Sequence, residues 1–305
     1  MTAADAGPIF IGGLSGSGKT QLRMALGAHP AITLTRRTRM WDRFYARFGD
    51  LRYPANLERC LATMLSDPGV QQLAPDERRV RRELADGPPT YARLFALLHQ
   101  HHAERAGSRR WGDQLGFIER FADPIFAAYP SARMVHMVRD PRRRPSTGRG
   151  RPGARAAKLG WETAMWLRSV ELATRNRRRY PDGYLVVRYE MFADRPADTV
   201  EVICSFIGER LLPPMADVVH GLRFGTGDTP PSTSGLAAMT LSPPAAAFVD
   251  HYAGPELARF GYPRTRPRLA GRDRVAFGLT TWPLNRAAMA AWRTFGPRPT
   301  PSGRW

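Results

Sequence analysis

The chain has 305 residues, of which 43% are hydrophobic and 24% are charged. This length and composition are typical of a globular protein with a substantial core and exclude a disordered or fibrous one. No apolar run reaches the roughly 18 residues of a transmembrane helix, and residues 1–8 lack the basic and apolar regions of a secretory signal. Cys60 and Cys204 have no metal-binding or redox spacing, so we expect a reducing, cytoplasmic location.

The net charge of +19 comes almost entirely from arginine, because lysine occurs only at positions 19 and 158. Such an excess predicts an anionic cofactor, an acidic acceptor, or a membrane or nucleic-acid surface, and charge alone does not separate these partners. A general preference for arginine makes any single surface arginine uninformative. Lys19 is informative, because it lies where a phosphate-binding loop requires a point charge.

The first element is a strand expected at residues 9–12, which leads into a glycine-rich turn. The segment Gly13 to Thr20 matches G-x-x-x-x-G-K-[ST], a loop whose backbone N–H groups bind phosphate oxygens. Gly13, Gly16 and Gly18 permit the turn, and the helix expected from about residue 18 to 28 directs its N-terminus at the anion. The strand–loop–helix context predicts a nucleotide-binding site.

Further elements follow in chain order. Residues 38–106 are expected to form a mainly helical cap over an acceptor pocket, with helices at 41–48, 55–65, 76–85 and 89–106. Two buried parallel strands are predicted at 133–138 and 184–187, separated by an irregular Arg/Pro/Gly-rich loop at 141–153 and a long helix at 154–179. Helices at 196–207 and 243–260 complete the domain, and a helix at 284–295 is expected in a basic Arg/Pro-rich tail.

Strands that alternate with long helices predict an α/β fold, with a P-loop-like parallel sheet flanked by helices and a helical cap insertion. We expect one domain at residues 1–263, with its cap at about 38–106, and a separate tail at 264–305. His99, His101 and His102 have helical spacing without a partner cluster, so we expect a helix surface and no metal site. The tail tryptophans favour a helix packed on the domain, and peripheral membrane contact is the alternative.

Four segments, in order, resemble the sulfotransferase family that uses 3′-phosphoadenosine 5′-phosphosulfate (PAPS), and they are closest to its tyrosylprotein-sulfotransferase-like branch and bacterial relatives. The first, Pro8 to Pro30, is similar to the 5′-phosphosulfate loop and its helix. The second, Pro130 to Arg142, resembles the start of the 3′-phosphate motif. Residues 184–209 are similar to the third strand and following helix of that family, and residues 241–263 to its closing helix.

The resemblance implies a PAPS-dependent transfer of a sulfuryl group to a hydroxyl or amine, without a metal. It implies that Arg139 binds the 3′-phosphate, that Thr147 (or the adjacent Ser146) and Arg151 assist it, and that Tyr189 contacts the nucleotide. The 5′ group would be held by the loop residues Ser15, Gly16, Ser17, Gly18, Lys19, Thr20 and Gln21. Lys19 would also stabilise the charge that develops on the leaving phosphate.

The sequence departs from this family at several positions. The early basic residue of the loop is Gly16, the lysine of a Trp-Gly-Asp-Lys pattern is Gln114, and the catalytic glutamate position is Arg37. Residues 224–258 contain no lysine or arginine. Candidate bases are Asp42, Asp113 and His29, in no firm order, and for His29 a structural role at a helix end is the favoured interpretation.

Two other functions remain open from the sequence. A P-loop kinase or phosphotransferase would use ATP and Mg²⁺, with Asp140 as the metal-binding residue. A catalytically degenerate relative would bind nucleotide or a polyanion without turnover. The acceptor is a small molecule, a peptide or a glycolipid; we expect no specific nucleic-acid partner, and the oligomeric state is open.

Overall fold

The computed structural model describes residues 7–143, 152–222, 224, 241–265 and 267–296. Five parallel strands form one sheet in the order β2-β3-β1-β4-β5. Their bounds are β1 Ile9–Gly13, β2 Ile32–Arg36, β3 Arg110–Gln114, β4 Arg133–Val138 and β5 Tyr184–Arg188. Parallel strands require helical crossovers, and these cover both faces of the sheet, so the expected α/β fold is confirmed.

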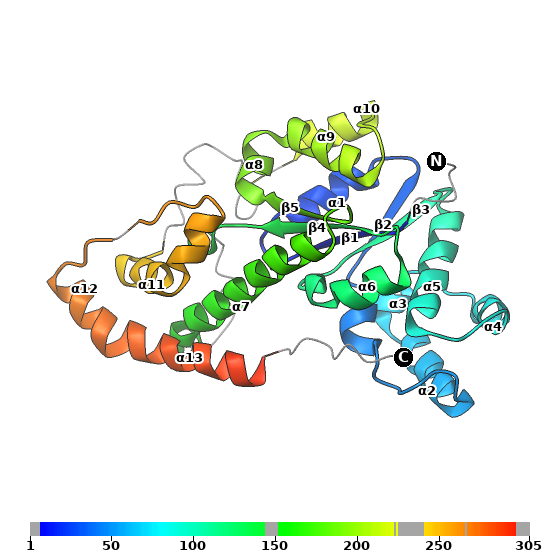
Figure 1. Cartoon of the computed structure of the whole chain (residues 1–305), viewed down its shortest axis with the longest axis horizontal. Helices are drawn as coiled ribbons and strands as arrows, with labels where there is room; N and C mark the ends of the chain where they lie inside the picture. Colours follow the sequence, from blue (N-terminus) through cyan, green and yellow to red (C-terminus); the bar gives the residue numbers. More distant parts are fainter. Residues whose placement is uncertain (1–6, 144–151, 223, 225–240, 266, 297–305) are drawn as a thin grey trace.

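The remaining elements surround this sheet (Figure 1). The first half of the chain contains α1 Lys19–Gly27, η2 Met40–Phe44, α2 Pro54–Leu65, α3 Pro68–Gln71, α4 Glu77–Ala85, α5 Tyr91–Arg105, η3 Ile118–Phe121, α6 Ala122–Ala128 and η4 Pro141–Arg143. The second half contains α7 Pro152–Arg179, α8 Tyr189–Asp194, α9 Pro196–Ile207, α10 Pro213–Gly221, α11 Pro243–Arg259, α12 Gly271–Ala276, η5 Phe277–Thr281 and α13 Trp282–Phe295. None of the described helices is long and apolar enough to cross a membrane.

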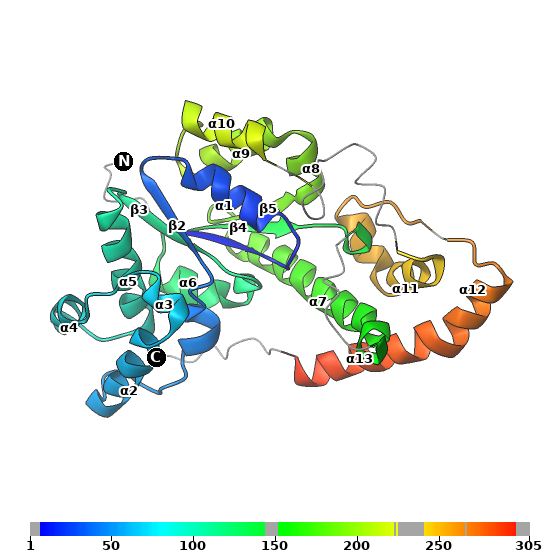
Figure 2. The same ribbon diagram turned by 180° about the vertical axis from the view of Figure 1, so that it is seen from behind.

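Alternating side chains of β1 direct the two halves of the core. Ile9 and Ile11 point to the layer of α1, α9 and α10, where Ile11 lies in one apolar cluster with Leu22. Phe10 points the other way, and its ring packs edge-on against Trp41 and Trp111 at 6.5 and 5.9 Å. Figure 2 shows the α1 layer from behind, with α7 on the opposite face of the sheet.

The sheet contains two strands that the sequence analysis missed. β2 is an edge strand of five residues, and β3 has the polar sequence Arg-Trp-Gly-Asp-Gln. Neither has the apolar run that identifies β1 and β4. In β3, the absence of a side chain at Gly112 lets β1 approach, since a Cβ there would lie 2.3 Å from the Ile9 carbonyl oxygen.

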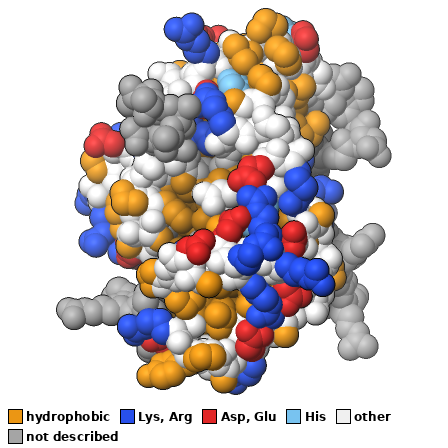
Figure 3. Space-filling model, turned by 90° about the vertical axis from the view of Figure 1, so that its right-hand side faces the viewer, with side chains coloured by type: hydrophobic (Ala, Val, Ile, Leu, Met, Phe, Trp, Pro, Cys, Tyr) orange, Lys and Arg blue, Asp and Glu red, His pale blue; other side chains and the backbone are white. Residues whose placement is uncertain are grey.

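The helical cap lies within the expected range of residues 38–106, with one correction. The helix expected at 41–48 is a five-residue π-type turn, η2, which ends at Phe44. Tyr45 then has extended backbone, and Ala46 has φ +58°, a value that a continuing helix does not allow. Figure 3 shows the side of the molecule that carries the cap, where a band of basic side chains lies beside acidic ones.

Packing does not separate the C-terminal segment from the domain at residue 263. Trp292 and Met289 of α13 are buried against α7, and the Asn285 side chain accepts the Gly160 N–H at 2.6 Å. Asp250 of α11 accepts hydrogen bonds from the backbone and hydroxyl of Thr265. The described part of the expected tail is therefore integral to the fold.

Two histidines of α5 are buried rather than on its surface. His99 stacks on Trp111 with ring centres 4.7 Å apart, and burial is the main cause that lowers its pKa to about 3. His101 lies 2.8 Å from Glu83. No group of three or more metal-ligating side chains occurs within the described ranges.

Candidate functional site

The segment between β1 and α1 forms the glycine turn that the motif predicts. Gly13, Gly16 and Gly18 have φ values of +114°, +78° and +89°, which residues with a Cβ rarely adopt. A Cβ on Gly13 would also lie 2.2 Å from the Met137 carbonyl oxygen. The turn directs the N-terminus of α1 at the loop, an arrangement that binds anions.

The predicted loop residues divide into buried and exposed groups. Ser15, Gly16 and Thr20 are exposed, Gln21 is half-buried, and Ser17, Gly18 and Lys19 are buried. The Lys19 ammonium folds back over the loop and donates to the Leu14 carbonyl at 2.5 Å. Its charge therefore lies within the turn, as the motif requires for a bound phosphate.

Arg139, at the end of β4, packs against the same loop. Its Nη1 donates to the Gly16 carbonyl at 2.9 Å, and its guanidinium carbon lies 4.0 Å from the centre of the Tyr189 ring. Tyr189 in turn contacts the loop, since a Cβ on Gly18 would lie 2.6 Å from its ring. The fold thus brings four predicted cofactor-binding residues from three segments into one cluster.

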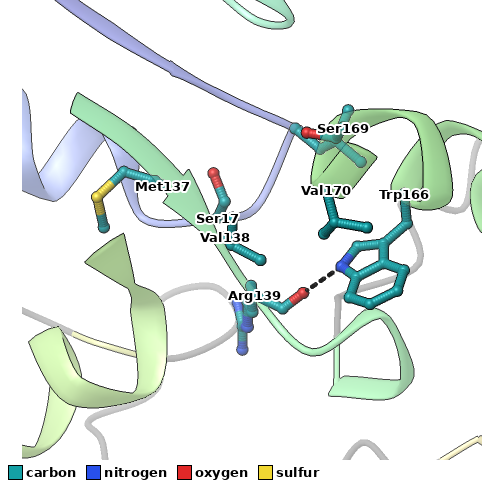
Figure 4. A pocket seen from close by; sticks show the side chains of 8 residues that line it. Ser17, Met137, Val138, Arg139, Trp166, Ser169 and Val170 are labelled. Atoms are coloured by element: carbon teal, nitrogen blue, oxygen red, sulfur yellow. Dashed lines mark hydrogen bonds between the residues drawn. The ribbon is translucent and has the colours of Figure 1, made fainter. Parts of the chain in front are cut away.

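The backbone of Arg139 is fixed from the opposite side. Trp166 of α7 donates its indole N–H to the Arg139 carbonyl at 2.9 Å, as Figure 4 shows. A cavity of about 10 Å³ lies between the loop, β4 and α7, and Ser17 and Ser169 are among its lining residues. Sequence reasoning missed Trp166 and Ser169, because one helix contains many apolar and polar positions that look alike.

Three buried polar atoms in this cluster have no hydrogen-bond partner within the part of the chain that the structure describes. They are Ser17 Oγ, Arg139 Nε and the Tyr189 hydroxyl. Burial lowers the pKa of Arg139, while Tyr189 and neighbouring acidic groups oppose this shift. Because buried polar atoms are nearly always paired, these three atoms are the ones with which this cluster could hydrogen-bond a polar ligand.

Asp140 does not have the geometry of a metal ligand, which contradicts the kinase interpretation. Its Oδ1 accepts from the backbone N–H and Nε of Arg142, and its Oδ2 accepts from Nη2 at 2.8 Å. Arg142 also pairs with Asp250 of α11 at 2.8 Å. The Asp140 carboxylate is therefore committed to joining β4 to α11.

Asp113 lies in the core rather than on a surface that substrate reaches. It is 0% exposed, its Oδ1 accepts from the Thr35 hydroxyl at 2.9 Å, and its Oδ2 accepts from the Thr38 hydroxyl at 2.5 Å. Burial raises its pKa to about 6, although both hydroxyls oppose the shift. We correct the predicted catalytic role: Asp113 is a positioning residue for the turn after β2.

Asp42 is the accessible member of the predicted acids. Its carboxylate is 16% exposed, and its Oδ2 pairs with Arg39 at 3.1 Å. Its Oδ1 is buried without a partner among the described residues. Trp41 contacts Phe121 of η3. Phe117, the residue before η3, donates its backbone N–H to the Gly13 carbonyl at the start of the loop. The turn η2, which carries Asp42, therefore packs against η3, and the residue before η3 contacts the start of the loop.

His29 is at the wrong edge of the sheet for catalysis. It precedes β2, its Nδ1 accepts the Ala31 N–H at 3.1 Å, and its Nε2 lies 3.6 Å from Glu209. These residues surround the amino ends of the strands, whereas the phosphate loop lies at the carboxyl ends. His29 is a structural residue at the end of α1.

Thr147 and Arg151, and the alternative Ser146, lie outside the described residues. Their predicted contacts with the 3′-phosphate stay predictions. Arg37, at the position of the family glutamate, is exposed with φ +57°. Gln114 has its Oε1 buried without a described partner.

A family model described as "Sulfotransferase family" matches residues 8–213. A search of curated proteins finds no significant match. Similar solved structures include the sulfotransferase domain of the Synechococcus PCC 7002 olefin synthase, at 20% identity and TM-score 0.47, covering 84% of this chain and 94% of that one.

Two further sulfotransferase structures are similar. One is from Alicyclobacillus acidocaldarius, at 16% identity and TM-score 0.44, covering 88% of this chain and 98% of that one. The other is from Mycobacterium tuberculosis H37Rv, at 17% identity and TM-score 0.45, covering 83% and 78%. At these TM-scores the resemblance carries no further argument, and function is argued from the family and from the site.

Proposed function

Since this chain belongs to the sulfotransferase family, we propose that it transfers a sulfuryl group from PAPS to a hydroxyl or amine of an acceptor. The observation that carries the proposal is the cluster of unpartnered buried atoms on Ser17, Arg139 and Tyr189 beside a phosphate-binding loop. All three of these atoms carry a hydrogen that they can donate to a phosphorylated nucleotide. The family and this donor set together support PAPS as the co-substrate.

The loop would hold the 5′-phosphosulfate. Its backbone N–H groups and the N-terminus of α1 supply the anion cradle, and Lys19 supplies the positive charge that the family places earlier in the loop. Gly16 lacks that charge, but the Lys19 ammonium lies within the same turn. Lys19 would therefore stabilise the charge that builds up on the leaving phosphate oxygen.

Arg139 would connect the 5′ and 3′ parts of the nucleotide site. Its Nη1 donates to the Gly16 carbonyl of the loop. Its Nε has no partner among the described residues and would donate to the bound anion. A guanidinium stacked on Tyr189 is held in one orientation, so little entropy is lost when it binds phosphate. Thr147 and Arg151 would complete the 3′ pocket.

In the reaction, an acceptor oxygen or nitrogen attacks sulfur in line with the bond to the phosphate. The new bond to sulfur forms as the sulfur–oxygen bond to the phosphate breaks, and that electron pair remains on the phosphate oxygen. The acceptor proton would pass to the carboxylate of Asp42, whose Oδ1 has no partner among the described residues. The cap aromatics around Trp41 favour an acceptor with an apolar part.

Calorimetric titration with 3′-phosphoadenosine 5′-phosphate (PAP), and separately with ATP and Mg²⁺, tests the assignment. We expect tight binding of PAP that chelation of metal leaves unchanged, and weak binding of ATP. Metal-dependent ATP binding would support a kinase instead. It would also require Asp140 to give up its hydrogen bonds with Arg142 in order to bind the metal. Turnover of PAPS with any member of a phenol and alcohol array would exclude a degenerate relative.

A further inference from the structure

A buried carboxylate lies directly beneath the entry of the phosphate loop. Glu119 of η3 is 0% exposed, and its Oε2 accepts the Gly13 N–H at 2.9 Å. These two residues are 106 positions apart in the chain. Gly13 is the first residue of the loop motif, so Glu119 holds the point at which the strand turns into the loop.

The other oxygen of Glu119 belongs to a hydrogen-bond network. Oε1 accepts from the Ser169 hydroxyl at 2.8 Å and lies 3.2 Å from Nε2 of His136. His136 Nε2 is 2.9 Å from the Ser169 hydroxyl, and its Nδ1 is 2.7 Å from the Tyr184 hydroxyl. The network therefore joins η3, β4, β5 and α7 beneath the loop.

The backbone of η3 is anchored as well. The Asn176 side chain donates to the Glu119 carbonyl at 2.8 Å, and Asn176 is 0% exposed. Both the side chain and the backbone of Glu119 are thus held from α7. A residue whose backbone and carboxylate are both held by hydrogen bonds orients its partner more firmly than one whose side chain is free to move.

Two adjacent glycines make room for this contact. A Cβ on Gly12 would lie 2.8 Å from Glu119 Oε2, and a Cβ on Gly13 would meet the Met137 carbonyl. Gly12 has an ordinary backbone conformation, so its glycine is required by the approach of the carboxylate and not by φ. The sequence thus accommodates Glu119 at the loop entry.

A buried anion beneath an anion-binding loop needs a counter-charge. Burial acts against ionisation of Glu119, but the charge of His136 and hydrogen bonds from His136 and Ser169 outweigh it and lower the Glu119 pKa to about 2. An uncompensated carboxylate there would repel the bound phosphate. His136 Nε2 lies 3.2 Å from Glu119 Oε1, the oxygen that does not accept from Gly13.

We propose that Glu119 is a positioning residue that fixes the first turn of the phosphate loop through the Gly13 N–H, while Ser169 and His136 hold its second oxygen. The network thereby sets the affinity of the loop for the 5′ group of the nucleotide. This inference rests on the proposed function for the identity of the ligand. The positioning of the loop by Glu119 does not depend on whether the protein turns over a substrate.

The test compares two nucleotides in Glu119→Gln, with Glu171→Gln, at an exposed carboxylate of α7, as the matched control. PAP carries a 5′-phosphate, and adenosine 3′-monophosphate lacks it. Charge-assisted hydrogen bonds are about twice as strong as neutral ones, so we expect the Kd for PAP to rise about tenfold in E119Q. The Kd for adenosine 3′-monophosphate should change less than twofold. E171Q, at a carboxylate outside this network, should leave the PAP affinity within twofold of the wild type.

A folded E119Q protein that binds PAP within twofold of the wild type overturns the proposal. An equal rise in the Kd for both nucleotides also overturns the proposal. Such a result would show a general disturbance of the site and not a specific effect on the 5′-phosphate. Circular dichroism establishes that the variant is folded.

A second measurement needs neither the variant nor a nucleotide. In the wild-type protein labelled with ¹⁵N-glycine, the Gly13 amide proton should exchange far more slowly than that of exposed Gly16, with a downfield shift. Exchange of Gly13 as fast as Gly16 overturns the positioning role. If PAP does not bind while Gly13 is protected, the proposed function fails and the positioning role stands.

Discussion

The Arg139 guanidinium lies 4.0 Å above the Tyr189 ring and donates to the Gly16 carbonyl at 2.9 Å. Through these two contacts, the ends of β4 and β5 and the phosphate loop form one unit. The arrangement places a cation beside the loop without using a loop residue. In the nucleotide site that we propose, Arg139 is a second cation beside the loop, in addition to Lys19.

Replacement of Arg139 tests this unit. Arg139→Ala should raise the Kd for PAP about a hundredfold, because it removes a charged donor and the ring contact together. Arg139→Lys keeps the charge but loses the planar stack, so it should recover only part of the affinity. Full recovery in R139K, measured by calorimetry, would show that charge alone matters.

Gly18→Ala should disrupt the loop. The added Cβ would lie 2.6 Å from the Tyr189 ring at a position with φ +89°, so both the ring and the backbone must shift. We expect PAP affinity to fall at least tenfold. Gly27→Ala is the control, since a Cβ there meets nothing within 4 Å and alanine favours helix. Unchanged PAP affinity in both variants argues against the described loop.

Asp42→Asn should slow turnover with the best acceptor of a phenol array. Loss of a general base typically costs about a hundredfold or more in kcat, with little change in KM for PAPS. Asp50→Asn is the matched control, because Asp50 pairs with Arg52 at 2.6 Å in the same cap. A kcat for D42N within twofold of D50N would remove Asp42 from the mechanism.

The raised pKa of Asp113 predicts that the free energy of unfolding depends on pH. Its pKa is about 6 in the fold against an ordinary 3.8, so ionisation above pH 6 destabilises the folded state. The stability of the wild type relative to Asp113→Asn should fall by about 2 kcal/mol as pH rises from 4 to 7. Urea denaturation of both proteins across this range measures the difference. A constant difference would mean that Asp113 titrates normally.

Trp292→Ala tests whether the C-terminal segment is integral to the fold. Removal of this buried ring from the α13–α7 contact should cost about 3 kcal/mol of unfolding free energy. Exposed Arg293→Ala on the same helix should stay within about 0.5 kcal/mol. Equal free energies of unfolding for W292A and R293A would show that the C-terminal segment is a separate tail.

Much of the fold could be predicted from local pattern. The strand–loop–helix unit and strands β4 and β5 were expected, because apolar runs, glycines and helix starts are written within a few residues. β2 and β3 were missed, since β3 takes its burial from neighbours on both sides and not from apolar residues of its own. The same strand carries Asp113, whose burial no local pattern reveals.

By itself, the sequence determined the phosphate loop, the class of fold and the family resemblance, because each depends on residues close together in the chain. Only the tertiary structure decided which charged groups are available. It buried Asp113 against two threonines, paired Asp140 with Arg142, and placed Oδ1 of Asp42 without a partner among the described residues. It also brought Glu119 under Gly13, a contact across more than a hundred residues. The availability of a charge depends on desolvation and on partners from other elements, and only the folded chain assembles these.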